Sequence, residues 1–214
     1  MKNMKLKLFF FYLIILFYLE FIFKIFVFNK IINLGTLYAF LFSISIALLL
    51  AILSNLFKDK LNKIITFIIT IGLIILFCFQ YIYNVLFSTI FSFNNIGLAS
   101  QAWDFRSIIF NQLKNSWLQL ILFFVPLILL IIFKKYFHFT KDHIKTRLLE
   151  ICLMVIVFLS SLLLLLPTKG VQYSAYEMYF LTNDPTVSAH SLGLLTTVRL
   201  DIKRTIFGFE NKQI

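Results

Sequence analysis

Five long apolar segments occupy most of this chain, and they constrain its fold more than any other feature. They cover residues 8–28, 37–57, 64–88, 117–133 and 148–166. A bilayer core about 30 Å thick is crossed by roughly 20 apolar residues in a helix. Because 61% of the residues are hydrophobic and only 14% are charged, one water-soluble core could not bury them. We therefore expect an all-α membrane protein, with five transmembrane helices in residues 1–166 and a connector in residues 167–214.

The first and the fourth apolar segments each have a feature that argues against a membrane span. Lysines precede the first segment, as in a signal peptide, but its apolar stretch is too long and no small-residue cleavage site follows. We interpret it as a retained helix. The fourth segment is the shortest and contains Pro126, whose freed backbone partner can be satisfied by neighbouring helices. The long semi-apolar loop before it, residues 89–116, is expected to lie along the membrane surface or to dip into it.

The basic residues predict the orientation of the chain. The net charge is +11, but Lys and Arg fall between the apolar segments, which favours a role in membrane orientation over nucleic-acid binding. With the N-terminus inside, the inside segments hold most of them, and the two outside loops hold only Lys30, Arg106 and Lys114. The inside set is Lys2, Lys5, Lys7, Lys58, Lys60, Lys63, Lys134, Lys135, Lys141, Lys145 and Arg147. Five crossings then place the C-terminus outside.

Two charged residues lie inside the first apolar segment. Glu20 and Lys24 are four residues apart, a spacing that puts them on one face of a helix, where they can pair. Ionisable groups inside membranes are costly and often functional, so a proton or ion path is one interpretation. Their position late in the segment favours the other, an intramembrane ion pair in which Lys24 extends its ammonium towards the interface.

Polar side chains also follow one face of the third segment, at Thr66, Thr70, Gln80 and Asn84. Such a stripe can line a cavity, but we expect it to join packed helices, as we do for the second segment. The second segment's polar residues are Ser43, Ser45, Ser54 and Asn55. His138 and His143 are five residues apart with no third ligand nearby, so no metal site is predicted. The sequence contains no recognisable nucleophile motif, phosphate-binding loop or zinc motif, and we assign no catalytic residue or cofactor.

The connector contains a basic amphipathic stretch near the end of the sequence. Residues 192–209 predict a helix whose apolar stripe is Leu195, Val198, Ile202, Ile206 and Phe209. Ser188 or Ser191 would cap its start, Gly208 would end it, and Asp201 could reach Arg204. Arg199, Lys203 and Arg204 are candidates for contact with lipid headgroups. This pattern is typical of a helix lying on anionic lipid, and equally of a helix packed against a soluble domain.

The run "HSLGLLTTVRLDIKRTIFGFE" at residues 190–210, after five apolar segments, resembles the connector of lipoteichoic acid synthase-like proteins. These are membrane-bound phosphoglycerol transferases of the sulfatase fold from Gram-positive bacteria. The resemblance implies an extracellular catalytic domain after the connector, with a bound divalent metal (typically manganese) and a threonine nucleophile. That domain transfers glycerol phosphate from phosphatidylglycerol to a growing polymer. Neither its metal ligands nor its nucleophile can be assigned in these 214 residues.

The expected function is therefore that of a membrane anchor in the bacterial cytoplasmic membrane, inactive by itself, with its C-terminus outside. Expected partners are phosphatidylglycerol and either further copies of the chain or cell-wall synthesis proteins, but no nucleic acid. Two alternatives stay open. One is a small transporter subunit that uses Glu20, Lys24 and the polar stripe, although five helices do not divide into two repeats. The other is a non-catalytic assembly protein that recruits cell-envelope enzymes.

Overall fold

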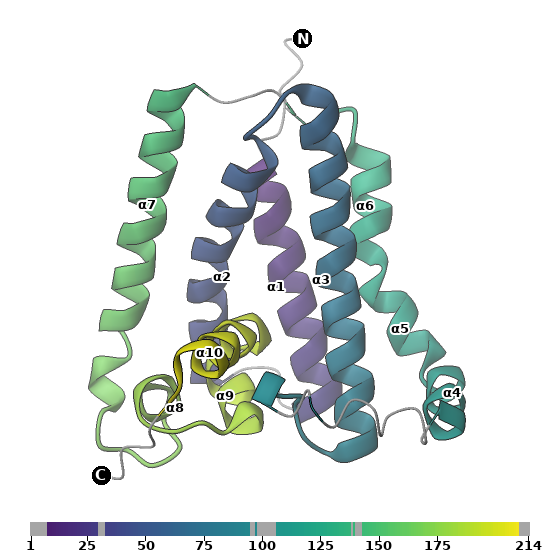
Figure 1. The fold of residues 1–214 in the computed structure, drawn as a ribbon, viewed down its shortest axis with the longest axis vertical. Helices are drawn as coiled ribbons and strands as arrows, with labels where there is room; N and C mark the ends of the chain where they lie inside the picture. Colours follow the sequence, from purple (N-terminus) through teal and green to yellow (C-terminus); the bar gives the residue numbers. More distant parts are fainter. Residues whose placement is uncertain are drawn as a thin grey trace.

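The computed structural model describes residues 8–29, 33–94, 97, 106–137, 139 and 143–209, and these residues form a helical bundle with a smaller group of helices at one end (Figure 1). The four longest helices run along the bundle. They are α1 (Leu8–Phe28), α2 (Leu34–Ser54), α3 (Asp59–Phe87) and α7 (Ile144–Leu163). Each coincides with a predicted span, and the bounds of α1 are those expected from its apolar segment.

The fourth predicted span is broken rather than continuous. It consists of α5 (Trp117–Phe123) and α6 (Val125–Phe133), which meet at Phe124. Pro126 lies in the first turn of α6, where its missing N–H removes no bond that the helix would otherwise make. The preceding helix, α4 (Arg106–Asn115), is bent by 76° from this pair. Part of the 89–116 loop is therefore helical and turned away from the span that follows it.

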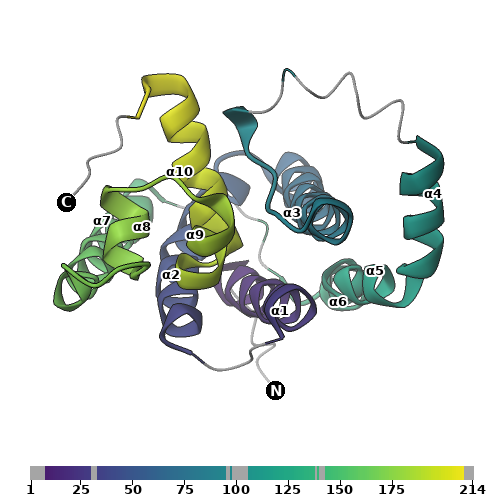
Figure 2. The ribbon, with the colours of Figure 1, turned by 90° about the horizontal axis from the view of Figure 1, so that it is seen from below.

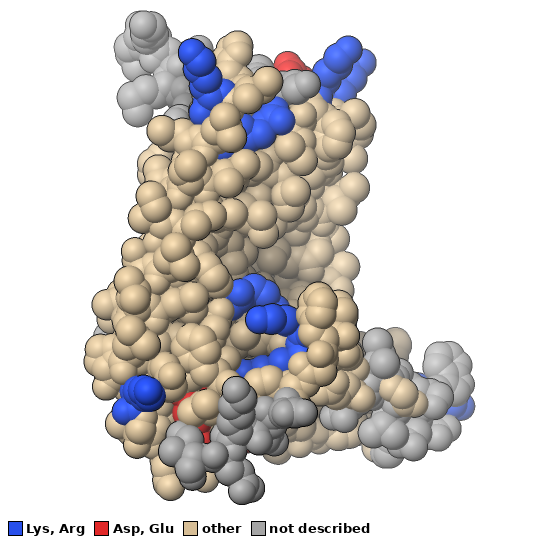
Figure 3. Space-filling view, turned by 60° about the vertical axis from the view of Figure 1, so that its left-hand side comes forward, with Lys and Arg blue, Asp and Glu red and all other residues tan. Residues whose placement is uncertain are grey.

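The described residues contain four candidate membrane spans, or five if the bent pair is one span. By length and hydropathy, α1, α2, α3 and residues Ile144–Thr168 could each cross a membrane, and the bent pair of α4 with Trp117–Phe133 could provide a fifth. The C-terminal ends of α2 and α6 and the N-terminal ends of α3 and α7 lie at one end of the bundle (Figure 1), and the predicted inside residues that the structure describes belong to these ends. Figure 3 shows Lys and Arg side chains at that end, and others in a hollow in the opposite half. The side of the membrane that each end faces stays a prediction.

Helix α1 forms the centre of the apolar core. Leu16, Leu19 and Phe23 are fully buried among α2, α3 and α5. Several polar side chains at the helix contacts are hydrogen-bonded within the bundle. The Tyr12 and Ser54 hydroxyls lie 2.6 Å apart between α1 and α2, and Thr66 donates to a carbonyl one turn earlier in α3.

The connector folds back across the end of the bundle instead of lying apart from it (Figure 2). It comprises the 3₁₀ turn η2 (Leu166–Thr168), α8 (Ala175–Phe180), α9 (Pro185–Leu192) and α10 (Leu194–Phe207). Asp184 caps α9 by accepting hydrogen bonds from the amides of Thr186 and Val187. Both α9 and α10 pack on α2, so the connector shares the core of the bundle.

The predicted amphipathic helix exists as α10, but two details of its prediction were wrong. It starts at Leu194, after Gly193, and neither Ser188 nor Ser191 caps it. Only the end at Gly208 is as expected, with a φ of 77°. The apolar stripe is also divided: Leu195 and Val198 are buried in the core, and the remaining members towards the C-terminal end are more exposed. Two of the five stripe residues therefore pack on protein and are unavailable to lipid.

Candidate functional site

The buried charges of α1 meet the connector at the junction between α9 and α10. Glu20 is 1% exposed, and its two carboxylate oxygens accept hydrogen bonds from the backbone amides of Leu194 at 2.9 Å and Leu195 at 2.8 Å. These amides open α10 and have no partner within their own helix. A carboxylate at this position also complements the positive end of the helix dipole. Glu20 is thus the N-terminal cap of α10, supplied from 174 residues away.

Lys24 binds the other side of the same junction. Its ammonium, on a side chain that is 2% exposed, donates to the backbone carbonyl of His190 at 2.9 Å. His190 lies in the last turn of α9, where carbonyls lack helical partners and the dipole favours a cation. We call Glu20 and Lys24 together the α1 clamp. The two charges attract each other, but their hydrogen bonds go to opposite helix ends of the connector.

Two glycines allow the backbones to come close enough for these bonds. Gly193 joins α9 to α10 with a φ of 87°, a conformation that L side chains rarely adopt. A Cβ at this residue would lie 2.6 Å from Cβ of Ala39 and 3.0 Å from Oε2 of Glu20. On α2, a Cβ at Gly35 would collide with the backbone of His190. The α9–α10 junction therefore packs directly against α1 and α2.

Asn33 and His190 extend the contact at the start of α2. The Asn33 side chain accepts a hydrogen bond from the amide of Thr36 at 2.8 Å, which caps α2. Its Nδ2 lies 3.1 Å from Nε2 of His190, and the ring of His190 packs edge-on against Phe28. His190 thus belongs to the junction that the α1 clamp holds.

A second carboxylate binds the connector to the segment after α3. Asp201 of α10 is buried and accepts hydrogen bonds from the Ser92 hydroxyl at 2.7 Å and from the Phe93 amide at 2.6 Å. Asp201 lies near Arg204, as the sequence suggested, but the hydrogen bonds shown for its carboxylate go to the segment after α3. Gln80, from the polar stripe of α3, holds the same segment through the backbone of Phe91.

The three basic residues proposed for lipid contact have different surroundings. Arg204 is buried, and its guanidinium donates to the side chain of Asn183 and to the carbonyls of Met178 and Tyr179. Burial lowers the pKa of Arg204, while the nearby Asp201 and Tyr179 act in the opposite direction. Lys203 is exposed.

The exposure of Arg199 is intermediate between that of the buried Arg204 and that of the exposed Lys203. It is partly exposed, donates to the Tyr179 hydroxyl at 2.8 Å and lies over the ring of Phe158. Arg204, whose hydrogen bonds are made to Met178, Tyr179 and Asn183, therefore stabilises the connector internally. Lipid contact by Arg199 and Lys203 stays a prediction.

The contacts of Glu20, Lys24 and Asp201 hold the connector to the bundle. Among the described residues, they do not form an arrangement typical of a catalytic site. Among the residues that the structure describes, no three His, Cys, Asp or Glu side chains gather as metal ligands would. His138 lies outside the described residues, and His143 precedes α7. Sequence reasoning singled out Glu20 and Lys24 but missed their partners. The available signal was a helix start at Gly193 with no capping side chain of its own.

No protein-family model, curated protein or solved structure matched this chain.

Proposed function

We propose that this chain is the membrane domain of a lipoteichoic acid synthase-like phosphoglycerol transferase. It would lie in the cytoplasmic membrane of a Gram-positive bacterium, with five spans and the connector on the outer side. One observation carries the proposal: the α1 clamp holds the run 190–210, the part of the sequence that resembles the family. His190, Leu194 and Leu195, which receive the clamp's hydrogen bonds, all belong to that run.

The role of the domain would be to position, not to catalyse. With α9 and α10 bound to α1 and α2, the end of α10 at Phe207 is held at a fixed place on the bundle. A catalytic domain attached there would face the outer leaflet, where its lipid donor phosphatidylglycerol is present. The metal and the nucleophile belong to that domain in the family, and this chain would supply neither.

The first test is the size and the activity of the native product. An antibody against the N-terminal segment should detect a membrane protein much larger than 25.2 kDa. Membranes that contain it should transfer glycerol phosphate from phosphatidylglycerol. A native product of 25.2 kDa, in membranes without this activity, would refute the proposal and favour the alternative of an assembly protein.

The positioning role needs a separate test on the same native product. Glu20→Gln should lower transfer from phosphatidylglycerol in the membrane and leave turnover of a water-soluble, short-chain analogue unchanged. Asp59→Asn, an exposed carboxylate at the opposite end of the bundle, is the matched control. If Glu20→Gln lowers both reactions equally, the clamp acts on folding of the whole protein and not on positioning.

The transporter alternative loses its main support. It needs Glu20 and Lys24 to be available to an ion or proton, and both are engaged by the backbone of the connector. Substrate-dependent flux in liposomes that is lost in Glu20→Gln would restore it.

A further inference from the structure

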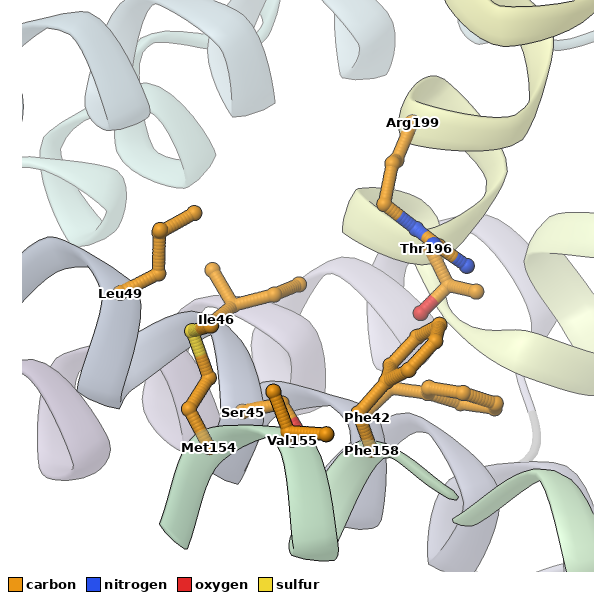
Figure 4. A pocket seen from close by; sticks show the side chains of 9 residues that line it. All are labelled: Phe42, Ser45, Ile46, Leu49, Met154, Val155, Phe158, Thr196 and Arg199. Atoms are coloured by element: carbon orange, nitrogen blue, oxygen red, sulfur yellow. The ribbon is translucent and has the colours of Figure 1, made fainter. Parts of the chain in front are cut away.

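A pocket of about 180 Å³ lies between α2, α7 and α10, apart from the α1 clamp. Figure 4 shows its side chains converging from the three helices. The lining residues are Phe42, Ser45, Ile46, Leu49, Met154, Val155, Phe158, Thr196 and Arg199. An apolar cavity of about 150 Å³ is large enough to bind a small hydrocarbon such as benzene. The pocket therefore has room for an apolar group, such as a section of one acyl chain.

The pocket wall is almost entirely apolar, and its charged lining residue, Arg199, lies at one end. Its walls on α2 extend from Phe42 to Leu49, a rise of about 10 Å along the helix axis, which is a third of the hydrocarbon layer. Leu49 and Val155 are 43% and 44% exposed, so the apolar end is open to the surroundings of the helices. Arg199 and Thr196 reach in from α10, at the connector end (Figure 4). An apolar space with a cation at the connector end matches the order of acyl chain and headgroup in a phospholipid.

Polar groups at the pocket are only partly satisfied by the protein. The Ser45 hydroxyl oxygen is buried on a side chain that is 6% exposed, and it has no hydrogen-bond partner among the described residues. Arg199 carries five N–H donors, of which one binds the Tyr179 hydroxyl, and its Cζ atom lies 4.9 Å from the centroid of the Phe158 ring. The protein contacts shown for Arg199 are thus to neutral groups, and they leave its charge to be matched by an anion.

We propose that this pocket binds one phospholipid with an anionic phosphate headgroup. One acyl chain occupies the space between α2 and α7, and the phosphate pairs with the guanidinium of Arg199, which suits phosphate oxygens geometrically. The inference does not depend on the proposed phosphoglycerol transferase, because it concerns lipid binding by this chain alone.

The test uses the full chain in nanodiscs that contain either phosphatidylglycerol or phosphatidylcholine with a photoreactive diazirine in the acyl chain. After illumination, labelled peptides are mapped by mass spectrometry. Labelling should concentrate on the pocket faces of α2 and α7 and should be about fivefold stronger with the phosphatidylglycerol probe. Uniform labelling of all lipid-facing helices, or equal labelling by both probes, would overturn the proposal.

Two substitutions separate the acyl chain from the headgroup. Val155→Trp fills the pocket and should reduce labelling there at least fivefold. Ile156→Trp is the matched control, since this neighbouring residue of α7 is exposed and does not line the pocket. Arg199→Gln should keep the labelling position but lose the preference for phosphatidylglycerol. Unchanged labelling in Val155→Trp refutes the pocket, and an unchanged preference in Arg199→Gln refutes the headgroup contact.

Discussion

Glu20→Gln is the sharpest perturbation of the α1 clamp, because it keeps the size of the side chain and removes its charge. The carboxylate accepts one hydrogen bond on each oxygen, whereas an amide has a single oxygen to offer. One of the two α10 amides therefore loses its acceptor, and the other keeps a neutral bond. Hydrogen bonds to charged groups contribute about 1.5–3 kcal/mol and neutral ones about 0.5–1.5 kcal/mol. Docking of the connector should weaken by about 3 kcal/mol, on the order of 100-fold.

Hydrogen–deuterium exchange of the chain in nanodiscs measures this loss directly. In wild type, the amides of Leu194 and Leu195 are buried and bonded, so they exchange only when the junction opens. Peptides that cover the α9–α10 junction should exchange on the order of 100-fold faster in Glu20→Gln. Peptides from the middle of α3 should not change, and neither should any peptide in Asp59→Asn. Exchange at the junction within about threefold of wild type would refute the assignment of Glu20 as the cap of α10.

Three further predictions concern the same contacts. Gly193→Ala should accelerate amide exchange across α9 and α10 far more than Gly208→Ala. Both glycines have a positive φ, but only at Gly193 would the added Cβ meet a neighbour within 4 Å. Equal effects would mean that backbone strain, not close packing, matters. Asp201→Asn should raise exchange at the Phe93 amide about tenfold, and an unchanged rate would remove Asp201 as the anchor of this segment. Lys24→Met should also accelerate amide exchange at the junction. The double variant with Glu20→Gln should lose less docking free energy than the sum of the two single changes. Simple additivity would contradict a coupled clamp.

Apolar length and periodicity predicted the long helices well, because a membrane span depends mainly on local composition. The bounds of α1 and the Gly208 end of α10 followed from residues close in sequence. The break at Phe124 was indicated only by Pro126, two residues later. Local signals of this kind do not say what a helix packs against. The sequence therefore left lipid and a soluble domain as equal alternatives for α10, whereas its N-terminal half is buried against the membrane bundle.

The partners of the buried charges could not be predicted for a physical reason. A spacing of four residues favours a Glu20–Lys24 pair when only the local helix is considered. The free amides and carbonyls at the α9–α10 junction offer better-matched partners, but they arrive from a segment more than 160 residues away. The same holds for Asp201, which lies near its local candidate Arg204 but accepts its hydrogen bonds from a loop amide and a serine hydroxyl. In each case a backbone group without a helical partner supplied the contact.

The depth of Glu20 explains why a charged residue is needed at this junction. Glu20 lies eight residues before the end of α1, or about 12 Å along the helix axis. If α1 spans the membrane, the junction at Gly193 reaches to that depth, where lipid offers no partner for a free helix end. Irregular backbone is stable there only when protein groups satisfy its amides and carbonyls, and Glu20 and Lys24 do so with charges that complement the two helix dipoles. Release of the connector would leave two free helix ends and two charges in an apolar layer, so the bundle and the connector should separate only together with unfolding of the junction.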